Sequence, residues 1–119
     1  MNKPMRVYLA GPISADSDEV VFANCQRAVD AGIELMQKGH FPFVPHLSLW
    51  TNTRAKVKLD VEFTWEQWMK LDDAFLQCCD ALLYLGSSRG ADQELERAKE
   101  LGLQIFYSVD EVPEVEVEE

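Results

Sequence analysis

The sequence feature that most constrains the fold is a regular alternation of short apolar segments with longer amphipathic ones. The short apolar segments are residues 6–10, 41–44, 81–85 and 103–107. The segments between them at 17–38, 64–79 and 88–101 carry apolar residues at helical spacing. Strands that are apolar throughout and alternate with helices are typical of a parallel sheet covered on both faces. We therefore predict an α/β fold with a parallel sheet of four or five strands.

Two further segments lack this pattern. Residues 46–60 show no clear periodicity, and we expect them to form a mobile loop. Residues 109–119 contain six acidic side chains and no basic one, which predicts a disordered acidic tail behind a single domain at residues 1–108. The domain itself carries 15 acidic and 11 basic residues. Because binding to extended nucleic acid requires a basic surface, we do not expect a nucleic acid polymer as partner.

The apolar and cysteine content narrows the class of protein. No apolar run approaches the ~20 residues of a membrane span, and the stretch at residues 7–10 is too short for a signal peptide. We therefore expect a cytoplasmic protein that does not associate with membranes. The three cysteines, Cys25, Cys78 and Cys79, form neither a CxxC motif nor a Cys/His cluster. Reduced thiols are expected, and no metal site.

Two acidic residues lie on the apolar faces of predicted helices. Asp72 is four residues from both Trp68 and Leu76, and Glu94 lies between Ala91 and Ala98. A carboxylate that faces a core costs free energy unless it is paired, hydrogen-bonded or neutral. Paired carboxyl groups cleave glycosidic bonds through an oxocarbenium-like transition state. The pattern alone leaves catalysis and structural hydrogen bonding open as roles for the two side chains.

The loop at residues 86–90 is a candidate anion site. It opens a helix with free backbone N–H groups and offers the hydroxyls of Ser87 and Ser88 beside Arg89. An ordinary strand-to-helix turn is the alternative, because the spacing and the lysine of a Walker loop are absent. In parallel sheets, ligands bind beyond the carboxyl ends of the strands, and this loop follows one such end.

Three segments resemble a known family over residues 5–107. They are YLAGPI at residues 8–13, DDAFLQCCD at 72–80 and SRGADQEL at 88–95. In order and spacing they are similar to segments of the nucleoside 2-deoxyribosyltransferase-like superfamily. The resemblance is strongest to a compact branch of that superfamily, related to the 2′-deoxynucleoside 5′-phosphate N-hydrolases. It implies a flavodoxin-like sheet and a substrate with an N-glycosidic bond between base and sugar.

The resemblance also implies roles for individual residues. Glu94 would be the glycosyl nucleophile, Tyr8 would hydrogen-bond its carboxylate, and Asp72 would donate a proton to the leaving base. No metal or organic cofactor is implied, because the carboxylate supplies the covalent step. The residues expected to bind substrate are Gly11, Pro12, Ile13, His46, Ser87, Ser88 and Gly90. His46 is included for its position, because it follows Pro45 at a strand end and could contact the base; a surface or internally hydrogen-bonded histidine is the alternative.

The resemblance bears on the substrate through position 88. Nucleoside-specific transferases carry an acid at the position of Ser88, whereas the nucleotide hydrolases carry a serine that faces a 5′-phosphate. A hydroxyl and helix N–H groups accept phosphate, so a nucleoside 5′-monophosphate is the expected substrate. The segment at residues 11–13 departs from the hydrolases, because it lacks the extra glycines and arginine of their first loop.

Other interpretations remain open at the level of sequence. The chain could be a deoxyribosyltransferase for free nucleosides, a non-catalytic nucleotide sensor on the same fold, or an interaction module that uses its acidic tail. Family relatives complete each site with a neighbouring subunit, so a homodimer or larger assembly is expected, with Trp65 and the loop before it as candidate contacts. The sequence does not specify the base, ribose or deoxyribose, or whether water or a second base accepts the sugar.

Overall fold

The computed structural model describes residues 2–116 and contains a four-stranded, all-parallel sheet. Its strands are β1 (Arg6–Ala10), β2 (Phe41–Phe43), β3 (Ala81–Tyr84) and β4 (Gln104–Phe106). They lie in the order β2-β1-β3-β4, so β1 is paired on both sides and Tyr8 is aligned with Phe43 on one neighbour and Leu82 on the other. The predicted α/β, flavodoxin-like fold is confirmed, with four strands.

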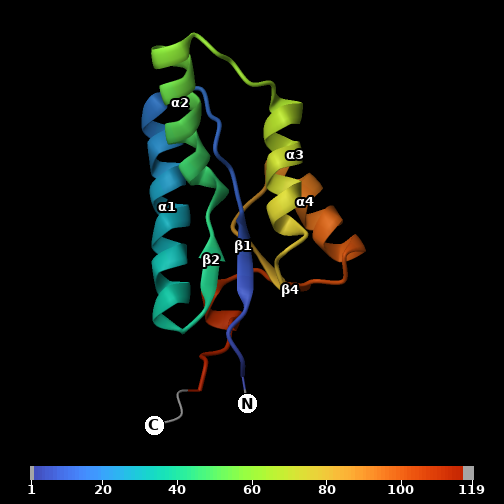
Figure 1. Ribbon diagram of the computed structural model, residues 1–119. Coiled ribbons are helices and arrows are strands. Elements are labelled where there is room, and N and C mark those ends of the chain that lie inside the picture. The colour runs from blue at the N-terminus through green and yellow to red at the C-terminus, as the bar shows by residue number, and fades with distance from the viewer. Residues whose placement is uncertain (1, 117–119) are drawn as a thin grey trace.

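Helices cover both faces of the sheet (Figure 1). They are α1 (Asp18–Gln37), α2 (Ser48–Leu59), α3 (Trp65–Leu76) and α4 (Arg89–Glu100), with short 3-10 turns η1 (Pro45–Leu47) and η2 (Val109–Glu111). Side chains of β1 alternate between the two faces. Val7 and Leu9 pack with α1, whereas Tyr8 and Ala10 pack with α3 and α4.

The helix boundaries follow from local chemistry. Ser17, Thr64 and Ser88 are N-caps whose side chains accept a backbone N–H from the first turn of α1, α3 and α4. Gly39 and Gly102 follow α1 and α4 with φ of 94° and 75°, a conformation in which a side chain would be strained. These elements match the predicted ones closely, because each has a cap and an apolar face to signal it.

The segment expected to be a mobile loop is instead helical. Residues 46–60 fall in η1 and α2, and Asp60 ends α2 in the left-handed conformation with φ of 53°. No residue of α2 is buried. The apolar residues of α2, such as Trp50 and Val57, are separated by the polar Thr53 and Arg54 and form no continuous buried stripe, which explains why periodicity failed to reveal the helix.

The disorder predicted for the tail does not hold for residues 109–116, and residues 117–119 lie outside the described part of the chain. Val112 is fully buried in the core on the α1 face. The ammonium group of Lys38 donates to the carbonyl oxygens of Val109 and Val112 at 2.9 and 2.8 Å. The acidic composition of the tail gave no sign of the two features that order it. Val112 packs into the core, and Lys38, which follows α1, binds the backbone of Val109 and Val112.

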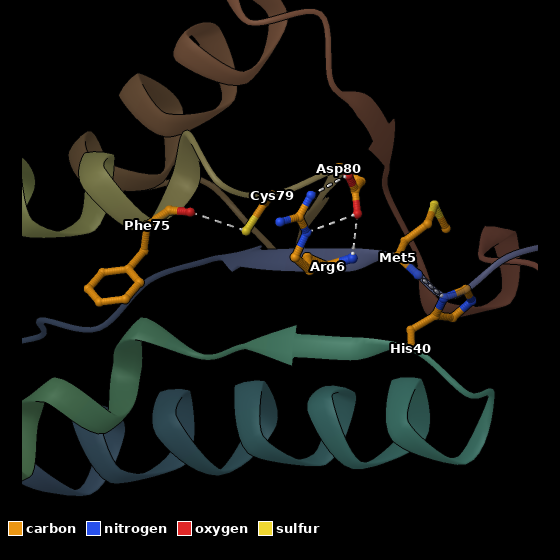
Figure 2. A network of polar contacts seen from close by, with 6 residues as sticks. All are labelled: Met5, Arg6, His40, Phe75, Cys79 and Asp80. Atoms are coloured by element: carbon orange, nitrogen blue, oxygen red, sulfur yellow. Dashed lines mark hydrogen bonds and ion pairs between the residues drawn. The ribbon is translucent and has the colours of Figure 1, made fainter.

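Polar contacts join the elements at the amino ends of the strands (Figure 2). The Arg6 guanidinium pairs with Asp80 at 3.1 Å and thereby ties the start of β1 to the start of β3. The backbone N–H of Met5 donates to Nδ1 of His40, whose Nε2 lies 2.6 Å from the carbonyl oxygen of Pro113. These contacts lie at the end of the sheet opposite to the carboxyl ends of the strands.

No helix in the described residues is long and apolar enough to cross a bilayer.

Candidate active site

A cavity of about 270 Å³ lies beyond the carboxyl ends of the strands. The loop after β1, the first turns of α2 and α4, and one side of α3 form its walls. Pro45 of η1 and residues from these four segments line it: Gly11, Ile13, Ser14, Ser48, Leu49, Asn52, Trp65, Trp68, Met69, Asp72, Ser88, Arg89, Gly90, Ala91 and Glu94. The cavity therefore brings together both carboxyl groups singled out in the sequence and much of the predicted substrate-binding set.

Glu94 is held by a phenol from the sheet. It lies in the second turn of α4 with 8% of its surface exposed, and the hydroxyl of Tyr8 donates a hydrogen bond to its Oε2. Tyr8 is wholly buried in β1, where its ring stacks on Phe43 at 5.5 Å. Burial and the neighbouring Glu94 raise the pKa of Tyr8, so the phenol stays neutral and remains a donor. The carboxylate is thus fixed in orientation by a rigid strand.

Asp72 presents a carboxyl group to the same cavity from α3. Only 7% of its surface is exposed, and its Oδ1 has no hydrogen-bond partner within the described residues. Desolvation by burial raises the pKa of Asp72 to about 6. A buried oxygen without a partner is costly in an empty site. It is therefore well suited to a ligand that accepts or donates a hydrogen bond there.

The two carboxyl groups influence each other's ionisation. The pKa of Glu94 is raised to about 7, mainly because the side chain is buried; the hydrogen bond from Tyr8 opposes the increase, and the nearby Asp72 carboxylate adds to it. Two carboxyl groups that titrate between about 6 and 7 hold one proton between them close to neutral pH. The site can therefore hold a carboxylate and a carboxylic acid at the same time. A displacement with acid assistance requires both, the carboxylate as nucleophile and the acid as proton donor.

The first turn of α4 supplies polar groups to one end of the cavity. The Ser88 side chain accepts the N–H of Ala91 at 3.1 Å, and its hydroxyl hydrogen remains free to donate. The Arg89 guanidinium lies 4.0 Å from the ring centre of Trp65, so this cation is held at the cavity wall by a cation–π contact. A helix N-terminus, a hydroxyl and a guanidinium together favour an anionic group.

Gly11 allows the loop after β1 to pass close to the end of β3. A Cβ atom at this position would lie 3.0 Å from Cβ of Leu85 and 3.7 Å from Nε2 of His46. A side chain there would require Leu85 to shift by a few tenths of an ångström, so glycine suits this close approach.

Three predicted substrate-binding residues lie outside the cavity. Ser87 is exposed and donates to the carboxylate of Asp92 at 2.7 Å. Pro12 packs against Gly86. His46 is 2% exposed and lines a separate groove between α1 and α2; its ring nitrogens have no hydrogen-bond partner in the described part of the chain, and burial lowers the pKa of its imidazole. Of the two serines in the loop, only Ser88 reaches the site.

The cavity also contains residues that sequence reasoning did not assign to it. Trp65, a candidate subunit contact in the sequence analysis, lines the cavity together with Trp68, whereas Trp50 is 81% exposed and lines the groove between α1 and α2. Trp68 lies one helical turn before Asp72, and that spacing was a usable signal. Ser48 and Asn52 come from α2, whose irregular sequence offered none.

Comparison with known proteins identifies a family without an assigned activity. Residues 5–107 match the model of a family described as a domain of unknown function, DUF4406. The chain belongs to the DUF4406 family. No curated protein matches it. The DUF4406 match contains every cavity residue and ends before the tail. Among residues 2–116 no three His, Cys, Asp or Glu side chains form a cluster that could hold a metal ion.

Proposed function

We propose that this DUF4406 domain cleaves the N-glycosidic bond of a nucleoside or deoxynucleoside 5′-monophosphate, with Glu94 as nucleophile. The observation that carries the proposal is the pair of buried carboxyl groups, Glu94 and Asp72, in one cavity with pKa values raised to about 7 and about 6. Perturbed acids that converge on a cavity are typical of catalytic sites. The sequence resemblance to the nucleoside 2-deoxyribosyltransferase-like superfamily gives the bond that they would break.

In the proposed reaction the Glu94 carboxylate attacks the anomeric carbon of the sugar. The bond from that carbon to the base nitrogen breaks, and the electron pair leaves with the base while the Asp72 carboxylic acid transfers its proton to it. Water or a second base then attacks the same carbon and releases Glu94 as a carboxylate. The proton of that acceptor returns to Asp72, so the site regains its starting state.

The remaining walls supply contacts for the rest of such a substrate. Ser88, Arg89 and the N-terminus of α4 form the end of the cavity suited to the 5′-phosphate. The rings of Trp65 and Trp68 offer flat apolar faces on which a base can stack. Ser87 no longer contributes to the phosphate site, because its hydroxyl is bound to Asp92.

The decisive experiment compares Glu94→Gln with wild type on a panel of nucleosides and monophosphates, with and without a second base, by measuring released base. We expect wild type to release base and Glu94→Gln to lose turnover by three orders of magnitude or more, as roughly found when a covalent nucleophile is removed. Glu96→Gln is the matched control, because Glu96 lies on the same helix and is exposed. Full turnover in Glu94→Gln would contradict the proposal. Binding of nucleotide by wild type without release of base would indicate a sensor instead.

A further inference from the structure

Helix α2 lacks the interactions that normally maintain a helix of its length. It has 12 residues, no side-chain N-cap and no buried residue. Isolated helices of this length are only marginally stable in water, and in proteins their stability comes from packing of an apolar face. Within one chain, α2 is held only by half-buried residues such as Leu49 and Asn52, which is little packing for a helix of its length.

The molecule is elongated, and α2 lies near one of its ends. Figure 1 shows α2 beside α1, at the end of the molecule opposite both termini. The radius of gyration is 14.8 Å and the longest dimension is 50 Å. A compact domain of this length has a radius of gyration of about 13.5 Å. The chain is thus more extended than a compact domain of the same length, with α2 at one end and the terminal segments at the other.

Between α1 and α2 lies an open apolar groove of about 680 Å³. Phe22 of α1, Leu47 of η1, and Trp50 and Val57 of α2 line it, and they are 64%, 63%, 81% and 78% exposed. These four side chains present roughly 450 Å² of apolar surface, given the areas of such side chains. That matches the ~300–600 Å² of the largest patch on a typical monomer, which is often functional, and is over half of the ~800 Å² that each partner buries in a stable interface.

The charges in the groove indicate what covers it. Asp30 on α1 and Arg54 on α2 line the two walls with opposite charges, and neither forms an ion pair within the described part of the chain. In a two-fold dimer, every contact between two different residues occurs twice. Arg54 can therefore approach Asp30 of the partner subunit at two symmetric places, with the apolar side chains between them.

We infer that the groove between α1 and α2 is a self-association surface, and that a second copy of this chain covers it in a two-fold dimer. The surface differs from the contact at Trp65 expected from the sequence, since Trp65 lines the active-site cavity. The inference does not depend on the proposed function, because it concerns the free protein.

A consequence for the active site does rest on the proposed function. Ser48, Leu49 and Asn52 form the cavity wall on the other side of α2, and Leu49 lines both the cavity and the groove. A partner that packs on the outer side of α2 would fix that wall. Monomeric variants should then bind a nucleoside monophosphate more weakly, even though Glu94 and Asp72 are intact.

The test measures the molar mass of the ligand-free protein by light scattering and sedimentation at micromolar concentration. Wild type should have twice the 13.6 kDa of one chain. Trp50→Glu should be monomeric. Asp30→Arg and Arg54→Asp should each raise the dissociation constant by roughly tenfold or more, because each places like charges together. The double variant with both reversals should recover the dimer, since the pair is restored with its signs exchanged.

Phe41→Glu is the control, because Phe41 is 62% exposed but lies at the start of β2, away from the groove. It should remain dimeric. Circular dichroism establishes that each variant is folded, and the charge reversals affect only exposed side chains. Three outcomes would overturn the inference. They are a monomeric wild type, a dimer that Trp50→Glu leaves intact, and single charge reversals that weaken the dimer without recovery in the double variant. A monomer that binds lipid vesicles through Trp50 would identify a membrane surface instead. If the dimer behaves as expected and no nucleotide binds, only the proposed function fails.

Discussion

The two carboxyl groups of the site have an unusual order of acidity. The proposed nucleophile, Glu94, has a pKa of about 7, whereas the proposed acid, Asp72, has a pKa of about 6. The form with Asp72 protonated and Glu94 ionised is therefore a minor one among the singly protonated forms.

This order predicts a narrow, bell-shaped pH dependence of kcat/KM. The active form of the pair carries one proton, so activity should fall below about pH 6, where both groups are protonated, and above about pH 7, where both are ionised. In Asp72→Asn the alkaline limb should disappear when activity is measured on a substrate with an activated leaving base. An alkaline limb that persists in Asp72→Asn would show that Asp72 does not supply the proton.

The same pKa shifts predict how stability depends on pH. The pKa of Glu94 is higher in the folded chain than the ordinary value of 4.5, so the folded state binds the proton more tightly. The resulting stability is present below about pH 4.5 and is lost as the pH rises through about 7. Glu94→Gln removes the charged form and should stabilise the protein at alkaline pH by ~1–3 kcal/mol.

Urea unfolding at acidic and alkaline pH measures this effect. Glu94→Gln should raise the midpoint at alkaline pH and change it little at acidic pH. Exposed Glu96→Gln should have no comparable effect at either pH. Equal changes in Glu94→Gln at both pH values would mean that burial of the charge is not the cause.

At the level of elements, the features that could be predicted were those with a local signal. The strands and α1, α3 and α4 were predictable because each has an apolar pattern and a cap or terminal glycine. Asp72 and Glu94 were predictable because a charge on an apolar face conflicts with that pattern. The pairing of Tyr8 with Glu94 spans 86 residues, and no local pattern contains it; it followed from resemblance. The residues of α2 that line the cavity were revealed neither by a local apolar pattern nor by the family resemblance.

The start of α4 carries the prediction on substrate class. Ser88 caps the helix and lines the cavity, and aspartate also caps helices well, so Ser88→Asp should preserve the fold. The new carboxylate would repel a phosphate. Loss of a charge-assisted hydrogen bond of about 1.5–3 kcal/mol should lower kcat/KM for monophosphates by ~10- to 150-fold. Activity on free nucleosides should be spared.

The measurement is the ratio of kcat/KM for a monophosphate to that for its nucleoside. Ser87→Ala is the matched control, because Ser87 lies outside the cavity and its hydroxyl donates to Asp92. It should leave the ratio unchanged. A wild type that already prefers the free nucleoside, with a ratio that Ser88→Asp does not alter, would place the enzyme with the nucleoside transferases.

At the scale of the whole molecule, the two faces of the sheet are covered differently. Helices α3 and α4 pack on one face, whereas the core of the other contains residues of α1 and Val112 from the tail. The tail is held by the bonds from Lys38 and by a backbone bond from Val115 to the carbonyl oxygen of Lys38 at 2.8 Å. The segment after β4 thus completes a layer of the fold at the end of the molecule away from the cavity.

This arrangement predicts that the tail contributes to stability rather than to the chemistry of the site. Val112→Ala removes two buried methyl groups and should lower the free energy of unfolding by about 2 kcal/mol. Val20→Ala, at a valine that is 49% exposed, is the control and should change it little. Deletion of residues 109–119 should destabilise the chain further, yet leave kcat/KM unchanged at a temperature where the protein remains folded, because none of residues 109–116 lines the cavity. Loss of a function without loss of stability after that deletion would instead identify the acidic tail as an interaction segment.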